Sequence, residues 1–450
     1  MSRRNTPEYH TVSFTAMAGG GQALGELENG KKCFAWGVLP GETAKVRITK
    51  KKSAFVEAVA EEIITASPER IAPTEPGSYL STSPWQIMTD EAEQHYKSQL
   101  IADAFRLHHL TLPGGAVYGD GAAFGYRNKV EFSWFSELAT PADEPDASTA
   151  TSSVDTLDLA FFRRGSKGKI IVDGTALARP EMNELARAVR DLLRRKGISA
   201  RQLKTLLIRA DQAGNCAWQL YTKDRLPDIM SADEAATLPA QGGEVIYSDP
   251  RSPASRITER FASFGNPVLS DTVLGVPFRY ATEGFFQVNL PVYEQALREM
   301  QQWVPADTPV VDLYSGVGSI GLTIGGNHVA LVEINEHAVR EMQRNITALG
   351  REGSATVVLA ASEDALDYIT GNATIIVDPP RAGLHTAVIK QLLNQRPARI
   401  IYLSCNPVTQ ARDIALLMAD GAYAIAHAQG YNFFPRTPHI EHLVVLGRTA

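Results

Sequence analysis

The sequence predicts an α/β protein built from three parts, and the clearest signal lies in its last third. From about residue 307 onward, short apolar runs alternate with helical patterns, as in a mostly parallel sheet with helices on both faces. Residues 10–66 alternate apolar runs with glycine turns, which is typical of a small antiparallel β-barrel. We therefore expect a barrel in residues 1–66, a central α+β domain in 75–270 and an α/β domain in 271–450.

Length and composition are those of a globular chain. The 450 residues suffice for two or three domains, and with 44% hydrophobic and 21% charged residues a sizeable core can form. The net charge is −6, so affinity for a polyanion would have to come from local basic clusters. No run approaches the roughly 18 uncharged apolar residues of a membrane span, and the first ten residues lack the apolar segment of a secretory signal. We expect a cytoplasmic protein without membrane association.

The chain contains three cysteines, Cys33, Cys216 and Cys405. They are odd in number and far apart in the sequence, which excludes a disulfide framework and a Cys-x-x-Cys metal site. Each cysteine therefore has to be considered by itself.

The predicted barrel carries a basic cluster. Five positive charges fall within eight residues: Lys45, Arg47, Lys50, Lys51 and Lys52. One interpretation is a hairpin end that is simply solvated. The other is a basic edge that contacts a nucleic-acid backbone. The sequence alone leaves both open.

The central region follows a proline-rich linker at residues 67–76. Helical spacing predicts a helix over 89–107 with Thr89 as its N-cap, which could pack on the C-terminal domain, and another helix near 180–196. Residues 137–156 are rich in Ala, Ser, Thr, Pro and acidic residues, which predicts a flexible surface loop.

The α/β region has a regular order of elements. Apolar runs predict strands at 309–314, 328–333, 355–360, 374–378 and 399–404. Helical patterns lie between some of them and end at Gly350 and Gly421, which suit helix C-termini. The last pair of strands is expected near residues 423–427 and 442–446.

A glycine-rich segment follows the first of these strands. Gly316, Gly318 and Gly321 let a ligand approach the backbone closely, and Glu333 ends the next strand where an acid can bind ribose hydroxyls. A nicotinamide dinucleotide and S-adenosylmethionine both fit this pattern, and the glycines could also serve packing alone. Asp312 favours S-adenosylmethionine, because a carboxylate there would repel a pyrophosphate but not a sulfonium.

Two polar residues come directly after later strands. Asp378 ends a buried strand ahead of two prolines, at the sheet edge where α/β enzymes place functional groups. Cys405 follows the next strand at the same edge. A lone cysteine is usually a small buried hydrophobe, but this position makes Cys405 a candidate nucleophile.

The segment FFPRTPHIEHLVVL (433–446) supplies the last candidate. Glu441 follows a proline-flanked loop that also contains His439. In isolation Glu441 could be an ordinary surface acid. If the loop folds over the sheet edge, Glu441 could serve as a general base opposite Cys405.

Five motifs together resemble a known family. GFFQVN (284–289), DLYSGVG (312–318), DPPRAG (378–383), SCNP (404–407) and FFPRTPHIE (433–441) occur in the order found in class I RNA 5-methyluridine methyltransferases. The resemblance implies a Rossmann-like S-adenosylmethionine-dependent methyltransferase domain, an N-terminal TRAM barrel and a central RNA-binding domain around YRNKVEF.

The resemblance also implies roles for individual residues. Cys405 would add to uracil C6 and so activate C5 toward the methyl group of S-adenosylmethionine, and Glu441 would then remove the C5 proton. The implied cofactor contacts are Gln287, Tyr314, Gly316, Gly318, Glu333 and Asp378. The candidate RNA contacts are Arg127, Lys129, Lys45, Arg47, Lys50, Lys51 and Lys52. The uridine would be unpaired or flipped out of its stack, in 23S rRNA rather than tRNA, and the enzyme would act as a monomer.

The chain departs from the family at three places. One is Ser319, at the end of the glycine motif, where relatives often have asparagine. Many relatives hold an iron–sulfur cluster through cysteines between barrel and central domain, but residues 77–88 contain none, so we expect no cluster. Ala361 stands where an acid or amide often meets the adenine.

Other activities fit the motifs less well. A cytosine-5 methyltransferase of RNA would carry a cysteine in the DPPRAG motif, and a base amino-group methyltransferase would have an aromatic residue in place of Arg381. A dehydrogenase gives no reason for Cys405 and Glu441. A non-catalytic RNA chaperone or a methyltransferase acting on another RNA base remain the alternatives.

Overall fold

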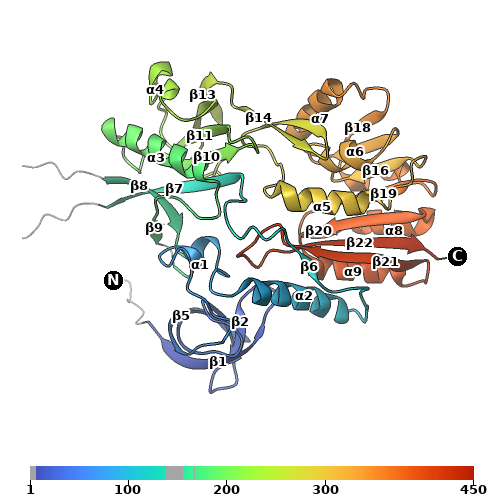
Figure 1. Ribbon diagram of the computed structural model, residues 1–450, viewed down its shortest axis with the longest axis horizontal. Helices are drawn as coiled ribbons and strands as arrows, with labels where there is room; N and C mark the ends of the chain where they lie inside the picture. The colour runs from blue at the N-terminus through green and yellow to red at the C-terminus, as the bar shows by residue number, and fades with distance from the viewer. Residues whose placement is uncertain (1–6, 138–155, 167, 450) are drawn as a thin grey trace, which may run out of the picture.

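A computed structural model describes residues 7–137, 156–166 and 168–449, and it shows a barrel, a central sheet and a C-terminal α/β sheet (Figure 1). The surface loop predicted at 137–156 lies outside the described residues except for its two end positions. None of the helices in the described part of the chain is both long and apolar enough to cross a membrane.

The N-terminal body is a closed five-stranded barrel. Its strands are β1 (Tyr9–Met17), β2 (Ala23–Glu26), β3 (Lys32–Trp36), β4 (Thr43–Lys51) and β5 (Phe55–Thr65). The sequence predicts an antiparallel barrel, and all pairs are antiparallel except β3 with β5, which are parallel because β4 crosses between them in the chain. Alternate residues such as Val12, Phe14 and Val46 fill the interior, since successive side chains of a strand point to opposite faces. Cys33 belongs to this apolar core.

A linking segment connects the barrel to the rest of the molecule. It contains α1 (Tyr79–Thr82), α2 (Asp90–Arg106) and β6 (Val117–Tyr118). Thr89 caps α2 by accepting a hydrogen bond from the Ala92 N–H, as predicted. Helix α2 packs against the C-terminal domain, and β6 pairs with the strand at residues 423–431 at the edge of that domain's sheet. This segment therefore joins the α/β core before the central domain begins.

The central domain is a seven-stranded sheet with the order β13-β12-β11-β10-β7-β8-β9. Its elements are β7 (Lys129–Glu137), β8 (Thr156–Phe162), β9 (Lys169–Ile171), α3 (Pro180–Arg195), β10 (Leu203–Ala210), β11 (Cys216–Thr222), α4 (Ala232–Ala236), β12 (Gly242–Tyr247) and β13 (Glu259–Gly265). The apolar face of α3, including Leu185 and Val189, packs on this sheet and shares a core with Trp218 of β11.

The C-terminal domain is an eight-stranded sheet with the order β18-β17-β16-β19-β20-β22-β21-β6. A hairpin and a helix precede it: β14 (Val268–Val273), β15 (Val276–Ala281) and α5 (Leu290–Gln301). Its further strands are β16 (Val310–Leu313), β17 (Val329–Glu333), β18 (Ala355–Leu359), β19 (Thr374–Val377), β20 (Arg399–Ser404), β21 (Tyr423–Tyr431) and β22 (Glu441–Arg448).

Helices cover both faces of this sheet, as the alternating pattern predicts. They are α6 (Ser319–Ile324), α7 (Glu336–Ala348), α8 (Thr386–Gln395) and α9 (Pro407–Met418). The neighbouring strands β18, β17, β16, β19 and β20 run parallel, whereas β22 is antiparallel to β20. The carboxyl ends of the parallel strands therefore meet at one edge, and the start of β22 reaches the same edge.

Candidate active site

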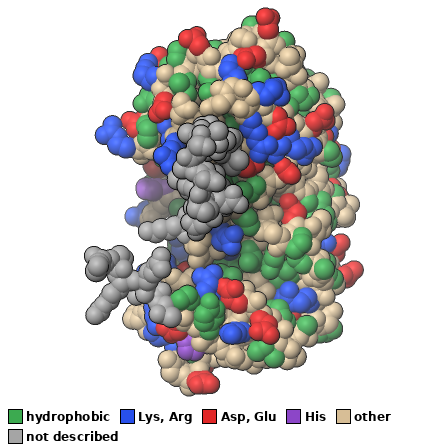
Figure 2. All heavy atoms as spheres, turned by 90° about the vertical axis from the view of Figure 1, so that its left-hand side faces the viewer, with side chains coloured by type: hydrophobic (Ala, Val, Ile, Leu, Met, Phe, Trp, Pro, Cys, Tyr) green, Lys and Arg blue, Asp and Glu red, His purple; other side chains and the backbone are tan. Residues whose placement is uncertain are grey.

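A cavity of about 1100 Å³ lies between the carboxyl edge of the C-terminal sheet and the central domain. Four kinds of segment line it: strand-end loops of the sheet, the segment that follows β15, the start of β7 and the loop between β21 and β22. Figure 2 shows the face on which the surface is hollowed between the central domain above and the barrel below, with Lys and Arg side chains on both sides.

The glycine loop after β16 opens directly onto this cavity. Gly316 has a φ of 56°, and an added Cβ there would meet no atom within 4 Å, so its backbone faces free space. Glu333 braces the loop by accepting hydrogen bonds from the Gly316 N–H at 2.8 Å and the Asn335 N–H at 2.7 Å. Tyr314, Gly316 and Glu333 line the cavity, and their contacts with a ligand stay a prediction. Gly318, also predicted as a cofactor contact, does not line the cavity and packs against Met342 and Leu322, because its turn directs it into the core.

Asp312 does not lie at the cavity, where its carboxylate is expected from the sequence to favour a sulfonium over a pyrophosphate. Its side chain is fully buried beneath the loop, does not line the cavity and accepts a hydrogen bond from the Gly321 N–H at 2.9 Å. Burial raises the pKa of this carboxyl to about 8, so it is largely uncharged at neutral pH. Asp312 therefore holds the glycine turn and does not select the ligand by charge.

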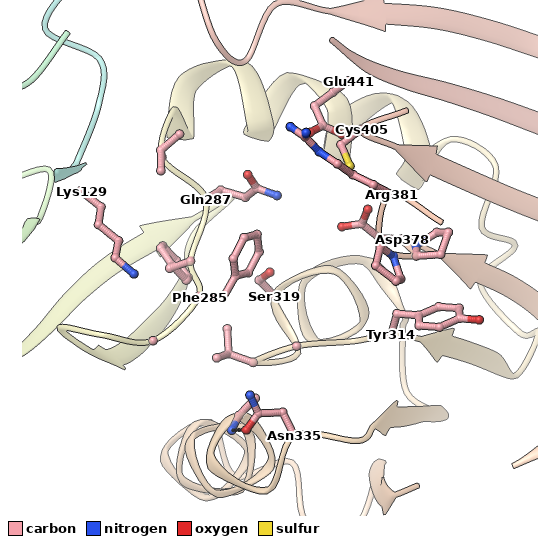
Figure 3. A pocket seen from close by; sticks show the side chains of 18 of the residues that line it. Lys129, Phe285, Gln287, Tyr314, Ser319, Asn335, Asp378, Arg381, Cys405 and Glu441 are labelled. Atoms are coloured by element: carbon pink, nitrogen blue, oxygen red, sulfur yellow. Dashed lines mark hydrogen bonds between the residues drawn. The ribbon is translucent and has the colours of Figure 1, made fainter. Parts of the chain in front are cut away.

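The segment after β15 carries Gln287 into the cavity (Figure 3). Its backbone is held by the central domain: the buried Arg209 guanidinium donates to the carbonyls of Gly284 and Phe286, the latter at 2.9 Å. Asn128 Nδ2 donates to the Gln287 carbonyl at 2.9 Å. Because alternate carbonyls point toward Arg209, the side chains of Phe285 and Gln287 are free to face the cavity.

Strand register brings the candidate catalytic groups together. Ser404 is paired with His442 across β20 and β22, so the next residues outward, Cys405 and Glu441, lie opposite each other. Asp378 directly follows the adjacent parallel strand β19, where the register places it opposite Leu403, two residues before Cys405. All three side chains line the cavity and lie next to one another (Figure 3).

The pKa values of these three groups are all raised. Burial, with the nearby Glu441 and Asp378 carboxyls, raises the pKa of the Cys405 thiol to about 11, and Arg381 partly offsets this rise. Burial raises the pKa of Asp378 to about 7. Burial and the charge of Asp378 raise the pKa of Glu441 well above its usual range. Ionisable groups with strongly perturbed acidity in a cavity are typical of an active site.

Comparisons with known proteins identify the family. The model of the tRNA (uracil-5-)-methyltransferase family matches residues 151–449. The chain belongs to this family. Curated relatives include uncharacterized RNA methyltransferases from Parasynechococcus marenigrum, 27% identical over 92% of this chain and 90% of theirs, and from Chlorobaculum tepidum, 29% identical over 95% and 94%.

The fold agrees with this assignment. The chain superposes on a crystal structure of a Pyrococcus abyssi tRNA (uracil-54, C5)-methyltransferase in complex with S-adenosyl-L-homocysteine with a TM-score of 0.74, at 20% identity, covering 97% of this chain and 100% of that one. The protein is therefore an S-adenosylmethionine-dependent RNA uracil-C5 methyltransferase.

The cavity of this methyltransferase fits its methyl donor. Glu333 can accept from ribose hydroxyls and the open face of Gly316 leaves room for the ligand's amino-acid part, while the exposed Ile334 and Ala361 offer apolar surface to an adenine. Ser362 and Glu363 line the cavity directly after Ala361. In the part of the chain that the structure describes, no three or more His, Cys, Asp or Glu side chains are grouped to hold a metal ion.

Arg381 was not predicted as a site residue from the sequence. Arg381 lies beside Cys405 and Glu441, and its Nη2 is 3.1 Å from His439 Nδ1 (Figure 3). Burial and the Arg381 charge lower the pKa of His439 to about 4, so the neutral ring accepts this hydrogen bond. The sequence signal for Arg381 was available, because it follows Asp378 by three positions in the same strand-end loop.

The predicted RNA contacts fall into two groups. Arg127 and Lys129 line the cavity, and burial with the nearby Arg209 lowers the pKa of Lys129 to about 8. The barrel residues lie on and just after β4, away from the cavity. Within the barrel Arg47 pairs with Glu61 at 2.6 Å, Lys50 with Glu57 at 3.2 Å and Lys51 with Glu8, while Lys45 lies over the Tyr9 ring at 5.5 Å. The basic stretch is thus largely neutralised by neighbouring acids, and its RNA contacts stay a prediction.

Proposed function

We propose that this enzyme methylates C5 of a specific uridine in structured RNA through a covalent adduct between Cys405 and uracil C6. The observation that carries the proposal is the strand register that sets Cys405 opposite Glu441 and beside Asp378 at the cavity wall. A nucleophile, a base and a second carboxyl at one sheet edge match the needs of a reaction at an unreactive ring carbon.

The Cys405 sulfur forms a bond to C6, and the electron pair of the C5–C6 double bond moves toward the uracil O4. Arg381 beside the sulfur stabilises the thiolate that this addition requires, which offsets the high pKa of the buried thiol. S-Adenosylmethionine, when bound, supplies an electrophilic methyl group on a sulfonium. C5 then carries both the methyl group and its original proton.

Glu441 takes the C5 proton, the double bond re-forms and the C6–sulfur bond breaks, which returns Cys405 as a thiolate. The raised pKa of Glu441 makes its carboxylate a stronger base than an exposed glutamate. Gln287 and Asp378, from opposite walls of the cavity, are placed to bind the donor or the polar edge of the uracil. C5 of a stacked, paired uridine is out of reach of such a cavity, so the uridine is unpaired or flipped.

The test is to incubate the purified protein with methyl-labelled S-adenosylmethionine and unmodified 23S rRNA and tRNA transcripts in parallel. Nucleoside mass spectrometry then locates the label. We expect it in 5-methyluridine from one transcript only, with 23S rRNA as the favoured class. Label in another nucleoside would contradict the reaction, and no label despite cofactor binding would favour a non-catalytic RNA-binding role.

A further inference from the structure

The loop that delivers Glu441 is buried. Residues 432–440 connect β21 to β22, whose ends Tyr431 and Glu441 are paired in register. Phe433 and Thr437 are almost completely buried, although connecting loops normally run over the surface. Phe434 and His439 of this loop also line the cavity. The loop is therefore part of the active-site wall. Strand register sets the backbone of Glu441, the first residue of β22, and the loop leads directly into it.

Four consecutive carbonyls of this loop accept hydrogen bonds from four different parts of the chain. The pairs are Asn289 Nδ2 to Phe433 at 3.2 Å, Lys97 Nζ to Phe434 at 3.1 Å, Tyr126 OH to Pro435 at 3.0 Å and the Trp85 N–H to Arg436 at 3.1 Å. The donors lie before α5, on α2, at the entry to the central domain and in the linking segment. Buried carbonyls need such partners, so the loop depends on groups far away in the sequence.

Two residues of α2 make further contacts with this loop. The Glu93 carboxylate accepts hydrogen bonds from the Arg436 N–H at 3.0 Å and from Asn432 Nδ2 at 2.9 Å. Lys97, one helical turn later, is 2.9 Å from Glu93 and also donates to Asn432 Oδ1 at 2.6 Å. Glu93 is 2% exposed and Lys97 0% exposed, so both charges are removed from water.

A buried ion pair of this kind contributes little to the free energy of folding. Desolvation of two charges commonly outweighs their attraction, and an apolar pair of similar size is often as stable. Here the remaining hydrogen-bonding capacity of the pair is directed at the loop. Arg436, a non-glycine residue with a φ of 63°, is held in this unfavourable conformation by Glu93 and by its own bonds to Met88 and Asp90.

We propose that Glu93 and Lys97 are positioning residues that hold the 432–440 loop so that Glu441 reaches the C5 proton. The inference rests on the proposed function, in which Glu441 is the base. Neither residue lines the cavity, so both act through the loop. A shift of the loop by about 1 Å would slow proton removal by up to about a hundredfold while leaving the strand-end residues in place.

The experiment uses the full-length Glu93→Gln variant, the double variant Glu93→Gln/Lys97→Met, and Glu441→Gln as the reference. The double variant removes both charges and so leaves no unpaired buried ion if the single variant folds poorly. Tyr96→Phe is the matched control, because Tyr96 lies on the same helix but donates to Glu69 at 2.6 Å and does not contact the loop. Turnover, cofactor affinity and the denaturation-resistant protein–RNA adduct are measured for each.

We expect the Glu93 variants to turn over at least about tenfold more slowly, with cofactor affinity within about twofold of the wild type and with accumulation of adduct. A merely structural role would lower the active fraction without trapping adduct. If Glu441→Gln accumulates adduct and both Glu93 variants do not, or if they turn over like Tyr96→Phe, the positioning role is overturned. If Glu441→Gln itself traps none, the base assignment fails, and this inference fails with it.

Discussion

The two walls of the active-site cavity are built in different ways. On one wall, the glycine loop, Asp378 and Cys405 each follow a parallel strand directly, so the hydrogen bonds of the sheet place them. The other wall is formed by the segment that carries Gln287 and by the 432–440 loop, whose carbonyls are held by side chains from the central domain and from α2. Glu441 itself begins β22 beside Cys405, directly after this loop. Changes in those remote elements should therefore disturb the second wall and spare the first.

The largest effect is expected at the strand-end wall itself. Cys405→Ala removes the group that activates C5, so turnover should fall by more than about a thousandfold. Cofactor affinity should stay within about twofold, because the glycine loop is untouched. Rates of methyl transfer and calorimetric binding of S-adenosylmethionine check both statements. Substantial residual turnover would remove the nucleophile assignment.

Glu441→Gln should produce the next largest effect, about a hundredfold loss of turnover. The variant can still form the sulfur–C6 bond and accept the methyl group, but it lacks a base for the C5 proton. Gel analysis under denaturing conditions should show protein linked to RNA that carries the methyl label. Only free RNA after incubation would count against Glu441 as the base.

Arg209→Met tests the dependence of the second wall on the central domain. The carbonyls of Gly284 and Phe286 lose their donor, so Gln287 should become mobile and cofactor affinity should weaken by about tenfold. Arg225→Met, an exposed residue paired with Glu259 in the same domain, is the control. Equal cofactor affinity in the two variants, measured on protein shown to be folded, would mean that the central domain does not support this wall.

Alkylation of Cys405 should report the electrostatics around the strand-end residues, including the neighbouring Glu441 carboxyl. Because the raised thiol pKa lies near 11, the thiolate fraction and hence the iodoacetamide rate should rise about tenfold per pH unit between pH 7.5 and 8.5. Asp378→Asn removes a charge that raises this pKa and should speed labelling a few-fold at a given pH.

Arg209→Met should leave this labelling rate unchanged, since it disturbs only the opposite wall. Mass spectrometry separates Cys405 from Cys33 and Cys216, which are at most 2% exposed and act as internal references. A labelling rate that is flat with pH, or slower in Asp378→Asn, would contradict the assigned cause of the shift.

The smallest effect is expected at the basic cluster of the barrel, none of whose residues lines the cavity. The double variant Lys45→Ala/Lys52→Ala should weaken RNA binding by about two- to threefold at low salt, with a smaller difference at high salt. Lys32→Ala, whose amine pairs with Glu26 at 2.5 Å, is the matched control. Identical RNA affinities for both variants would favour the solvated-hairpin interpretation of the basic cluster.

The sequence by itself determined the α/β class, the barrel and the strand-end positions of Asp378 and Cys405, because apolar periodicity and turn residues are local signals. Glu441 was predicted only through the family motifs, since nothing local shows that its loop folds over the sheet edge. The charges of the β4 segment were visible, but not that Glu57 and Glu61 of the next strand would neutralise two of them.

Only the tertiary structure decided what holds the second wall. Lys97 and Asn432 are 335 positions apart and Arg209 and Phe286 are 77 apart, and no periodicity connects such pairs. A buried lysine or arginine looks in the sequence like any exposed one, so its role depends on which carbonyls the fold brings to it. The strands specify the reactive residues locally, whereas the geometry between them depends on side chains from the linking helix and the central domain.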